Sequence, residues 1–278
     1  MNDVAFGQYY PSNSAVHKLN ASVKILIVIA YIVAVFLVQS FHFAGFLACF
    51  IFVVLATVFA KVPFGKVLAS IKGIIFFIVL SAVLQIFFNK QGTPLWEGGF
   101  ITDQGLLTAG FITARITLVV LGASLLTLTT SPVEIADGIE DLLFPLKLVK
   151  FPVHEFALIM SIALRFIPTL LDETDRIIKA QKARGANFES GSLFARAKAL
   201  VPVLIPLLIS SFRRADELAS AMDSRCYAGS KVRTKFKKAT FGLGDLISIL
   251  ITAGLVVGVV LLNGFYLYPY IMQVVALL

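Results

Sequence analysis

Residues 105–130 read GLLTAGFITARITLVVLGASLLTLTT, and this stretch decides what kind of fold the chain adopts. A helix needs about 20 apolar residues to cross a bilayer. The stretch exceeds that length, and Arg115 is its only charged residue. In hydrocarbon the backbone must satisfy its own hydrogen bonds, so a lipid-exposed span of this kind is helical. The stretch therefore predicts a transmembrane α-helix.

The chain of 278 residues has the composition of an integral membrane protein. It is 58% hydrophobic and 14% charged, with a mean hydropathy of +0.91, whereas soluble domains carry about 25% charged residues. Apolar runs of nearly span length occur at residues 23–41, 43–60, 71–88, 105–130 and 245–264. We predict an all-α membrane protein with about five transmembrane helices.

The basic residues predict how the chain is oriented and divided. Residues 131–240 hold 17 of the 24 Lys and Arg residues, and positively charged connections stay in the cytoplasm. Residues 91–104 contain no basic residue, so this loop is expected outside, together with the C-terminus. We expect three parts: residues 1–130 with the N-terminus inside and four spans, residues 131–240 as a cytoplasmic coupling segment, and residues 241–278 with the last span.

Two more apolar stretches, residues 156–171 and 199–212, leave a second topology open. If both crossed, the six basic residues of 172–198 would lie outside, against the charge rule. The stretches also contain Arg165 and three prolines. We expect helices that lie along or just below the membrane surface instead.

The coupling segment predicts three long amphipathic helices. Residues 131–134, Ser-Pro-Val-Glu, supply the cap, the first-turn proline and the glutamate of a helix start. A second helix is expected from about residue 152 to 183, where Gly185 stops it. A third is expected from about residue 193 to 224, limited by Gly229.

The ends of the second and third helices repeat one another. When Arg184 is aligned with Arg225, Asp175 falls on Asp216. Each helix ends on an arginine between two small residues, in the tripeptides Ala183-Arg184-Gly185 and Ser224-Arg225-Cys226. An unobstructed guanidinium suits a carboxylate on another protein, so these ends are candidate plugs for acidic grooves. The alternative is that each arginine only complements the negative end of its helix dipole.

These motifs resemble those of the transmembrane T component of energy-coupling-factor (ECF) transporters, related to the cobalt-uptake CbiQ proteins. The resemblance covers nearly the whole chain and is most specific in the two arginine tripeptides. The family's second tripeptide is often Ala-Arg-Gly, so Ser224 and Cys226 are departures that leave the arginine in place. The N-terminal pattern consists of Gly7, Tyr9, Pro11, Ser14, His17 and Leu19, and leads into Lys24.

The resemblance implies a scaffold in a prokaryotic plasma membrane, without chemistry or cofactor of its own. Such T components hold two ABC-type ATPase subunits through their coupling helices, here through Ala183, Arg184, Gly185, Ser224, Arg225 and Cys226. Their membrane helices hold an exchangeable S component that binds a vitamin or other micronutrient. The scaffold transmits ATP-driven motion between the two. In agreement, the sequence contains no Gly-x-x-x-x-Gly-Lys-Ser/Thr phosphate loop.

Two other classes of membrane protein stay open from the residues alone. A lipid-headgroup transferase would bind Mg²⁺ through clustered acids such as Asp137 and Asp141, but Asp137-Gly138 lacks the Ala-Arg pair of that class. A secondary transporter would carry ionisable groups at mid-membrane, and only Arg115 lies near the middle of a predicted span. Arg115 pairs with a backbone carbonyl or a neighbouring helix, or marks a shifted span boundary.

The remaining polar features have simpler explanations. The basic run at residues 231–238 adjoins the last span, so contact with anionic lipids explains it better than nucleic acid does. Cys49 and Cys226 form neither a metal-binding spacing nor a disulfide framework. We expect no catalytic, metal or cofactor site.

Overall fold

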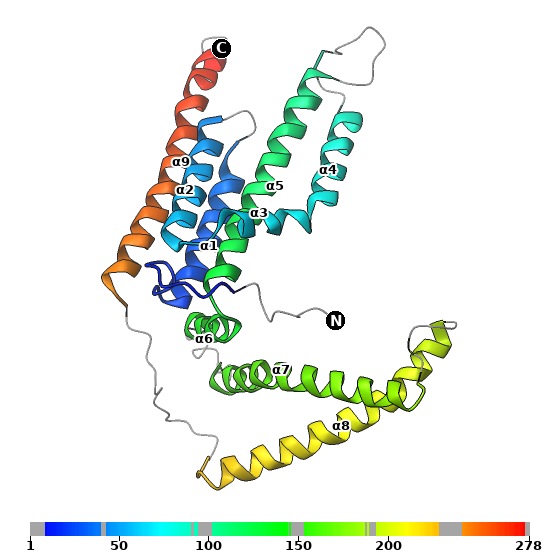
Figure 1. Ribbon diagram of the computed structural model, residues 1–278. Coiled ribbons are helices and arrows are strands. Elements are labelled where there is room, and N and C mark those ends of the chain that lie inside the picture. The colour runs from blue at the N-terminus through cyan, green and yellow to red at the C-terminus, as the bar shows by residue number, and fades with distance from the viewer. Residues whose placement is uncertain are drawn as a thin grey trace. The chain divides into compact units, whose positions relative to one another are not determined.

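In the residues that it describes, the regular elements of the computed structural model are helices, and the chain divides into two compact units (Figure 1). It describes residues 9–39, 43–89, 92–93, 102–143, 145, 153–186, 188, 193–227 and 241–275. Gly7, Gly229, residues 94–101 of the predicted outer loop and the basic run 231–238 lie outside this range. The first unit joins residues 1–142 to 239–278, and the second is residues 143–238.

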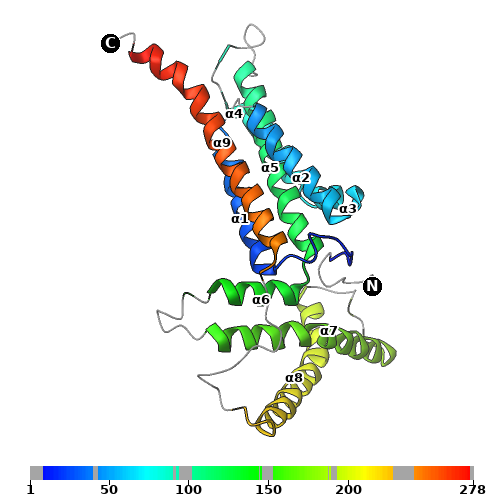
Figure 2. The same ribbon diagram turned by 90° about the vertical axis from the view of Figure 1, so that its left-hand side faces the viewer.

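The first unit contains most of the helices. They are α1 (Ala21–Leu37), α2 (Phe43–Ala60), α3 (Phe64–Lys72), α4 (Ile75–Phe88), α5 (Asp103–Thr129), α6 (Pro132–Leu143) and α9 (Leu243–Val275). Figures 1 and 2 both show α1, α2, α5 and α9 running side by side, with α4 against α5. In both views α6 lies across the end of this bundle, just beyond the end of α5.

Three helices are long and apolar enough to cross a membrane: residues 43–60, 103–129 and 243–264. The pair α3 and α4 counts as a fourth span if the two are taken together. Helix α1 is apolar but has only 17 residues. All five predicted spans therefore correspond to apolar helices, and three or four meet the length and composition of a span.

The third predicted span is the one whose outline was wrong. We expected a single helix over residues 71–88, but the chain forms α3 and α4, bent by 60° at Gly73 and Ile74. Helix α3 is amphipathic and buries Val67. The sequence did not predict α3, because Lys66 and Lys72 interrupt the apolar run that would indicate a span.

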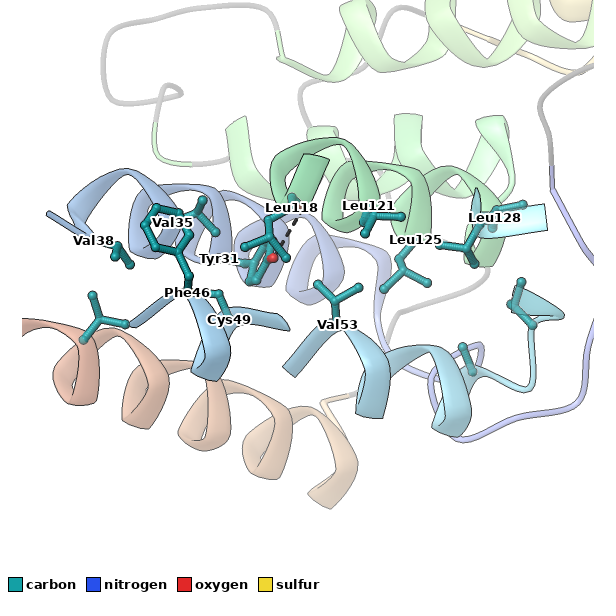
Figure 3. Close-up of a cluster of buried hydrophobic side chains, with 14 of the residues drawn as sticks. Tyr31, Val35, Val38, Phe46, Cys49, Val53, Leu118, Leu121, Leu125 and Leu128 are labelled. Carbon is teal, nitrogen blue, oxygen red and sulfur yellow. Dashed lines mark hydrogen bonds between the residues drawn. The ribbon is translucent and has the colours of Figure 1, made fainter. Parts of the chain in front are cut away.

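The core of the first unit is centred on Tyr31 of α1 (Figure 3). Its ring is 1% exposed and stacks on Phe52 of α2, with centroids 5.5 Å apart. The hydroxyl donates a hydrogen bond of 3.3 Å to the carbonyl of Leu118 on α5, so its buried polar atom is satisfied. Gly122, one turn further along α5, faces the edge of the same ring. Tyr31 thus joins three helices at one point.

Arg115 caps the carboxyl-terminal end of α1. Its Nη2 donates to the carbonyl of Val38, the C-cap residue, and its guanidinium lies 5.6 Å from the ring centre of Phe46. Asn263 of α9 donates to the neighbouring Leu37 carbonyl at 2.6 Å. The pairing of Arg115 with a backbone carbonyl, one of the three open alternatives, is therefore confirmed. It satisfies carbonyls that a helix end otherwise leaves unbonded.

The predicted start of α6 is confirmed in atomic detail. The Ser131 hydroxyl accepts from the Glu134 amide at 3.3 Å, and the Glu134 carboxylate accepts from the Ser131 amide at 3.1 Å. This is the reciprocal capping box. By its contacts α6 belongs to the first unit, where Ser22 of α1 donates to Asp141 at 3.4 Å. The predicted division at residues 130 and 240 concerns the side of the membrane and stays a prediction.

Substitution at Gly122 tests the central packing. Gly122→Leu is expected to lower the thermal midpoint of the purified chain in detergent, because a Cβ at this position would overlap the Tyr31 ring. Overpacking of this kind costs about 1–3 kcal/mol. Gly254→Leu on α9 is the matched control, since a Cβ there meets open space in the chain. Equal midpoints for the two variants would contradict the close approach of α1 and α5.

Candidate functional site

The candidate site lies on the two helices of the second unit, α7 (Val153–Ala183) and α8 (Leu193–Asp223). Both run unbroken through their prolines, Pro168 in α7, and Pro202 and Pro206 in α8. Neither is among the candidate membrane spans found in the described residues. Two of the three predicted amphipathic helices thus form this unit, and both end within one residue of the expected position.

Helix α7 ends in a left-handed turn directly after Arg184. Gly185 has φ +90°, and its amide donates to the Lys182 carbonyl at 3.0 Å. The Ala186 amide reaches back five residues to the Gln181 carbonyl, also at 3.0 Å. This is the Schellman cap, in which glycine takes the position that other residues adopt only with strain.

Helix α8 ends with the same hydrogen bonds at the equivalent positions of the repeat. The Cys226 amide donates to the Asp223 carbonyl at 2.9 Å, and the Tyr227 amide donates to the Met222 carbonyl at 3.0 Å. Cys226 has φ +57°, although it carries a Cβ. The repeat seen in the sequence is therefore a repeat of backbone geometry, and Cys226 departs from glycine where glycine is favoured.

With these caps, both arginines lie exposed at the ends of their helices. Arg184 and Arg225 are exposed. In the part of the chain that the structure describes, neither guanidinium is paired with a carboxylate. Because the last carbonyls of each helix are already bonded by backbone amides, the arginine side chains are not needed to satisfy them. Their five donors are available to a partner.

The two helices pack antiparallel, so their arginine ends point in opposite directions (Figure 1). The Gln181 amide of α7 donates to the Pro202 carbonyl near the start of α8 at 3.5 Å. Further back on α7, Glu173 meets Arg214 near the end of α8. The site therefore consists of two arginines at opposite ends of one helix pair, rather than one cluster.

Glu173 is the polar centre of the α7–α8 contact. Its carboxylate accepts from the Ser210 hydroxyl at 2.6 Å and from Arg214 Nη2 at 2.6 Å. The hydrogen bond from Ser210, and then the bond and charge of Arg214, hold the pKa of Glu173 below its usual range. The carboxylate therefore stays ionised at neutral pH. The sequence alone does not predict this contact, because nothing local identifies a partner on another helix.

The N-terminal pattern of the resemblance forms a compact turn in the first unit. His17 Nε2 lies 2.9 Å from the Tyr10 carbonyl, and its Nδ1 lies 2.7 Å from the Ser14 hydroxyl. A carbonyl only accepts, so Nε2 carries the proton. The Tyr10 amide donates to the Leu128 carbonyl at 2.9 Å, which attaches this turn to the end of α5.

Lys24 and Asp245 connect this turn to three helices of the bundle. Lys24 is buried, and its ammonium donates to the carbonyls of His17 and Thr129, each at 3.1 Å. Asp245, at the start of α9, accepts from the backbone amides of Asn20 and Gly242, each at 2.9 Å. These side chains hold the starts of α1 and α9 and the end of α5 together. Their role here is structural.

A cavity of about 450 Å³ lies among α1, α2, α5 and α9. Its lining is almost wholly apolar, and among the described residues that line it Lys24 is the one with a charged side chain. That ammonium already donates to two carbonyls. Ligand sites combine an apolar lining with several polar groups that fix orientation. In addition, the described residues contain no group of three His, Cys, Asp or Glu side chains placed to bind a metal ion.

The two caps predict opposite effects of substitution. Gly185→Ala is expected to destabilise the last turn of α7 by about 1–2 kcal/mol, since alanine resists the left-handed conformation. Cys226→Gly is expected to stabilise the last turn of α8 for the same reason. Hydrogen exchange of the backbone amides at residues 184–186 and 225–227 measures both changes. Exchange that is unchanged in both variants would contradict the left-handed caps.

Comparisons with known proteins identify the family. The model of the CbiQ family, described as cobalt transport protein, matches residues 12–236. The energy-coupling factor transporter transmembrane protein EcfT of Ruminiclostridium cellulolyticum is 46% identical over 265 residues, which cover 95% of this chain and 98% of that protein. The EcfT protein of Clostridium kluyveri is 47% identical over 253 residues, covering 90% and 93%. That of Bacillus subtilis is 41% identical over 260 residues, covering 92% and 97%.

Similarity of this extent covers the spans as well as α7 and α8, and it decides between the classes that the residues alone left open. The chain belongs to the CbiQ family, within its energy-coupling factor transporter transmembrane proteins, which are non-catalytic multi-pass membrane subunits of bacterial ECF transporters.

Proposed function

We propose that this chain couples two ABC ATPase subunits to a membrane-embedded S component, and that Arg184 and Arg225 are the contacts with the ATPases. ATP-driven motion of the ATPases would pass through α7 and α8 to the membrane helices. The S component would bind the vitamin or other micronutrient, since the cavity of the first unit offers one charged group that is already bonded.

One observation carries this proposal: the two arginine ends have the same backbone hydrogen bonds and point in opposite directions. Two matched ends suit two similar partners. The flanking residues Ala183, Gly185, Ser224 and Cys226 are small, so they leave room for a groove wall on either side of each guanidinium. A guanidinium can bind a carboxylate through two parallel hydrogen bonds, which gives geometric specificity as well as affinity.

The proposal also commits to an orientation and a span number. We infer five spans, with α3 and α4 as one bent span and the short α1 as another. The N-terminus and the second unit lie in the cytoplasm, and the C-terminus lies outside. The distribution of basic residues supports this orientation, because 17 of the 24 lie in residues 131–240. The capped C-terminal end of α1 supports its role as a span, because helix ends inside a bilayer must have their carbonyls satisfied.

The native cysteines test the orientation without any substitution. Cys226 is exposed at the end of α8, whereas Cys49 is buried in α2. A membrane-impermeant maleimide is expected to label the chain only after cells that express it without its partners are opened. Thr93→Cys, at an exposed position between α4 and α5, is expected to react in intact cells. Labelling of Cys226 in intact cells would place the second unit outside and contradict the proposal.

Charge reversal tests the two contacts. The double variant Arg184→Glu with Arg225→Glu is expected to abolish uptake and to lose the ATPases during purification. Removing one partner of a buried interfacial charge pair costs about 2–5 kcal/mol, mainly as faster dissociation. Arg→Lys variants should rescue poorly, because an ammonium keeps the charge but not the planar fork. Co-purification of the ATPases and uptake of radiolabelled vitamin measure both effects.

Lys198→Glu is the matched control for these variants. Lys198 is exposed on α8, and its reversal changes the charge of the unit by the same amount. We expect it to retain most uptake. If Lys198→Glu and the arginine variants reduced uptake alike, the ATPases would be held by diffuse electrostatic attraction, and the arginines would have no specific role.

A further inference from the structure

The repeat that aligns Arg184 with Arg225 also describes where α7 and α8 touch. The same alignment places Glu173 on Arg214, so these two residues occupy equivalent positions in the two copies. They are also direct partners, with Glu173 Oε2 and Arg214 Nη2 2.6 Å apart. Equivalent positions of two antiparallel helices can meet at one place only, which is where a local two-fold axis passes between the helices.

A second contact supports this symmetry. Gln181 lies eight residues after Glu173 and bonds the carbonyl of Pro202, which lies eight residues before Ser210. Ser210 in turn bonds Glu173. Equal steps in opposite directions are what an antiparallel pair requires. Arg184 and Arg225 each follow the Glu173–Arg214 contact by eleven residues, or roughly 16 Å along a helix axis.

The residues that meet at this contact carry opposite charges in the two copies of the repeat. Asp172 and Glu173 align with Arg213 and Arg214. Opposite charges are also aligned further along, Arg176 with Glu217 and Lys182 with Asp223, but among the described residues the structure gives no contact between the members of these pairs. At a two-fold axis a residue faces its own equivalent, so two identical charged residues would repel. At Glu173 and Arg214 the opposite charges make this meeting an ion pair.

We propose that Glu173 and Arg214 are positioning residues that fix the crossing point of α7 and α8 and thereby set the spacing of Arg184 and Arg225. The ion pair has partly exposed side chains, 22% for Glu173 and 36% for Arg214. Its importance therefore lies in geometry rather than in strength. Arms of equal length on either side of the contact present the two arginines to partners that are related by a two-fold axis. A displacement of one arm is carried through the contact to the other.

The spacing can be measured directly in the full chain. Spin labels at Lys179→Cys and Ser220→Cys occupy equivalent, exposed positions between the contact and each arginine. The native cysteines are replaced by Cys49→Ala and Cys226→Gly. A single narrow distance distribution is expected for this background. Glu173→Gln or Arg214→Gln is expected to broaden the distribution. Exchange of the two charges, Glu173→Arg with Arg214→Glu, is expected to make it narrow again.

Arg213→Gln is the matched control. It removes the same charge from the adjacent position of α8. Among the described residues, the ion pair of Arg213 is with Glu217 on its own helix, at 3.8 Å, and both side chains are highly exposed. The distance distribution should stay narrow in this variant. Broadening by Arg213→Gln equal to that by Arg214→Gln would overturn the proposal, as would a charge exchange that restores nothing.

The coupling role rests on the proposed function, and a second measurement separates the two. In the assembled transporter, Glu173→Gln keeps both arginines and should keep both ATPases bound, while uptake per ATP hydrolysed falls about fivefold or more. Unchanged uptake per ATP would overturn the positioning role and leave the arginine contacts standing. Conversely, ATPases that stay bound after reversal of Arg184 and Arg225 would refute the proposed contacts, whereas the distance measurement would still test the crossing point.

Discussion

A bilayer offers the backbone no hydrogen-bond partner, and the first unit is organised around that constraint. The carboxyl-terminal end of α1 takes a donor from α5 and another from α9, through Arg115 and Asn263. The opposite end is held by Asp245, which bonds the amide of Asn20. Capping side chains from neighbouring helices therefore do two things at once. They bond backbone groups at the ends of the short helix α1, and they fix its position between α5 and α9.

At the ends of α7 and α8, the last carbonyls are bonded without the help of side chains. A left-handed residue turns the chain so that backbone amides bond the last carbonyls. The arginine before that residue is then free for another role, in contrast to Arg115, which is engaged as a cap. The difference between these arginines lies in where each stands relative to a helix end. Arg115 reaches the end of another helix, whereas Arg184 and Arg225 stand at the ends of their own.

The two units divide the properties that a coupling subunit needs. The first unit has a packed centre around Tyr31 and a cavity with one charged side chain, and its polar groups serve mainly to join helices. The second unit exposes its arginines and joins its helices through an ion pair with Ser210 beside it. In the proposed function, rigid contact within each unit lets motion pass from the ATPases to the S component.

The sequence by itself determined the features whose causes are local. Runs of apolar residues predicted the spans, residues 131–134 predicted the capping box of α6, and the repeat around Arg184 and Arg225 predicted two matched helix ends. Tertiary structure decided which distant groups meet: Arg115 of α5 with the Val38 carbonyl, and Glu173 of α7 with Arg214 of α8. It also decided the break between α3 and α4. Periodicity and capping act over a few residues, whereas the partner of a charged side chain depends on how helices pack. The local sequence around such a residue therefore does not identify its partner.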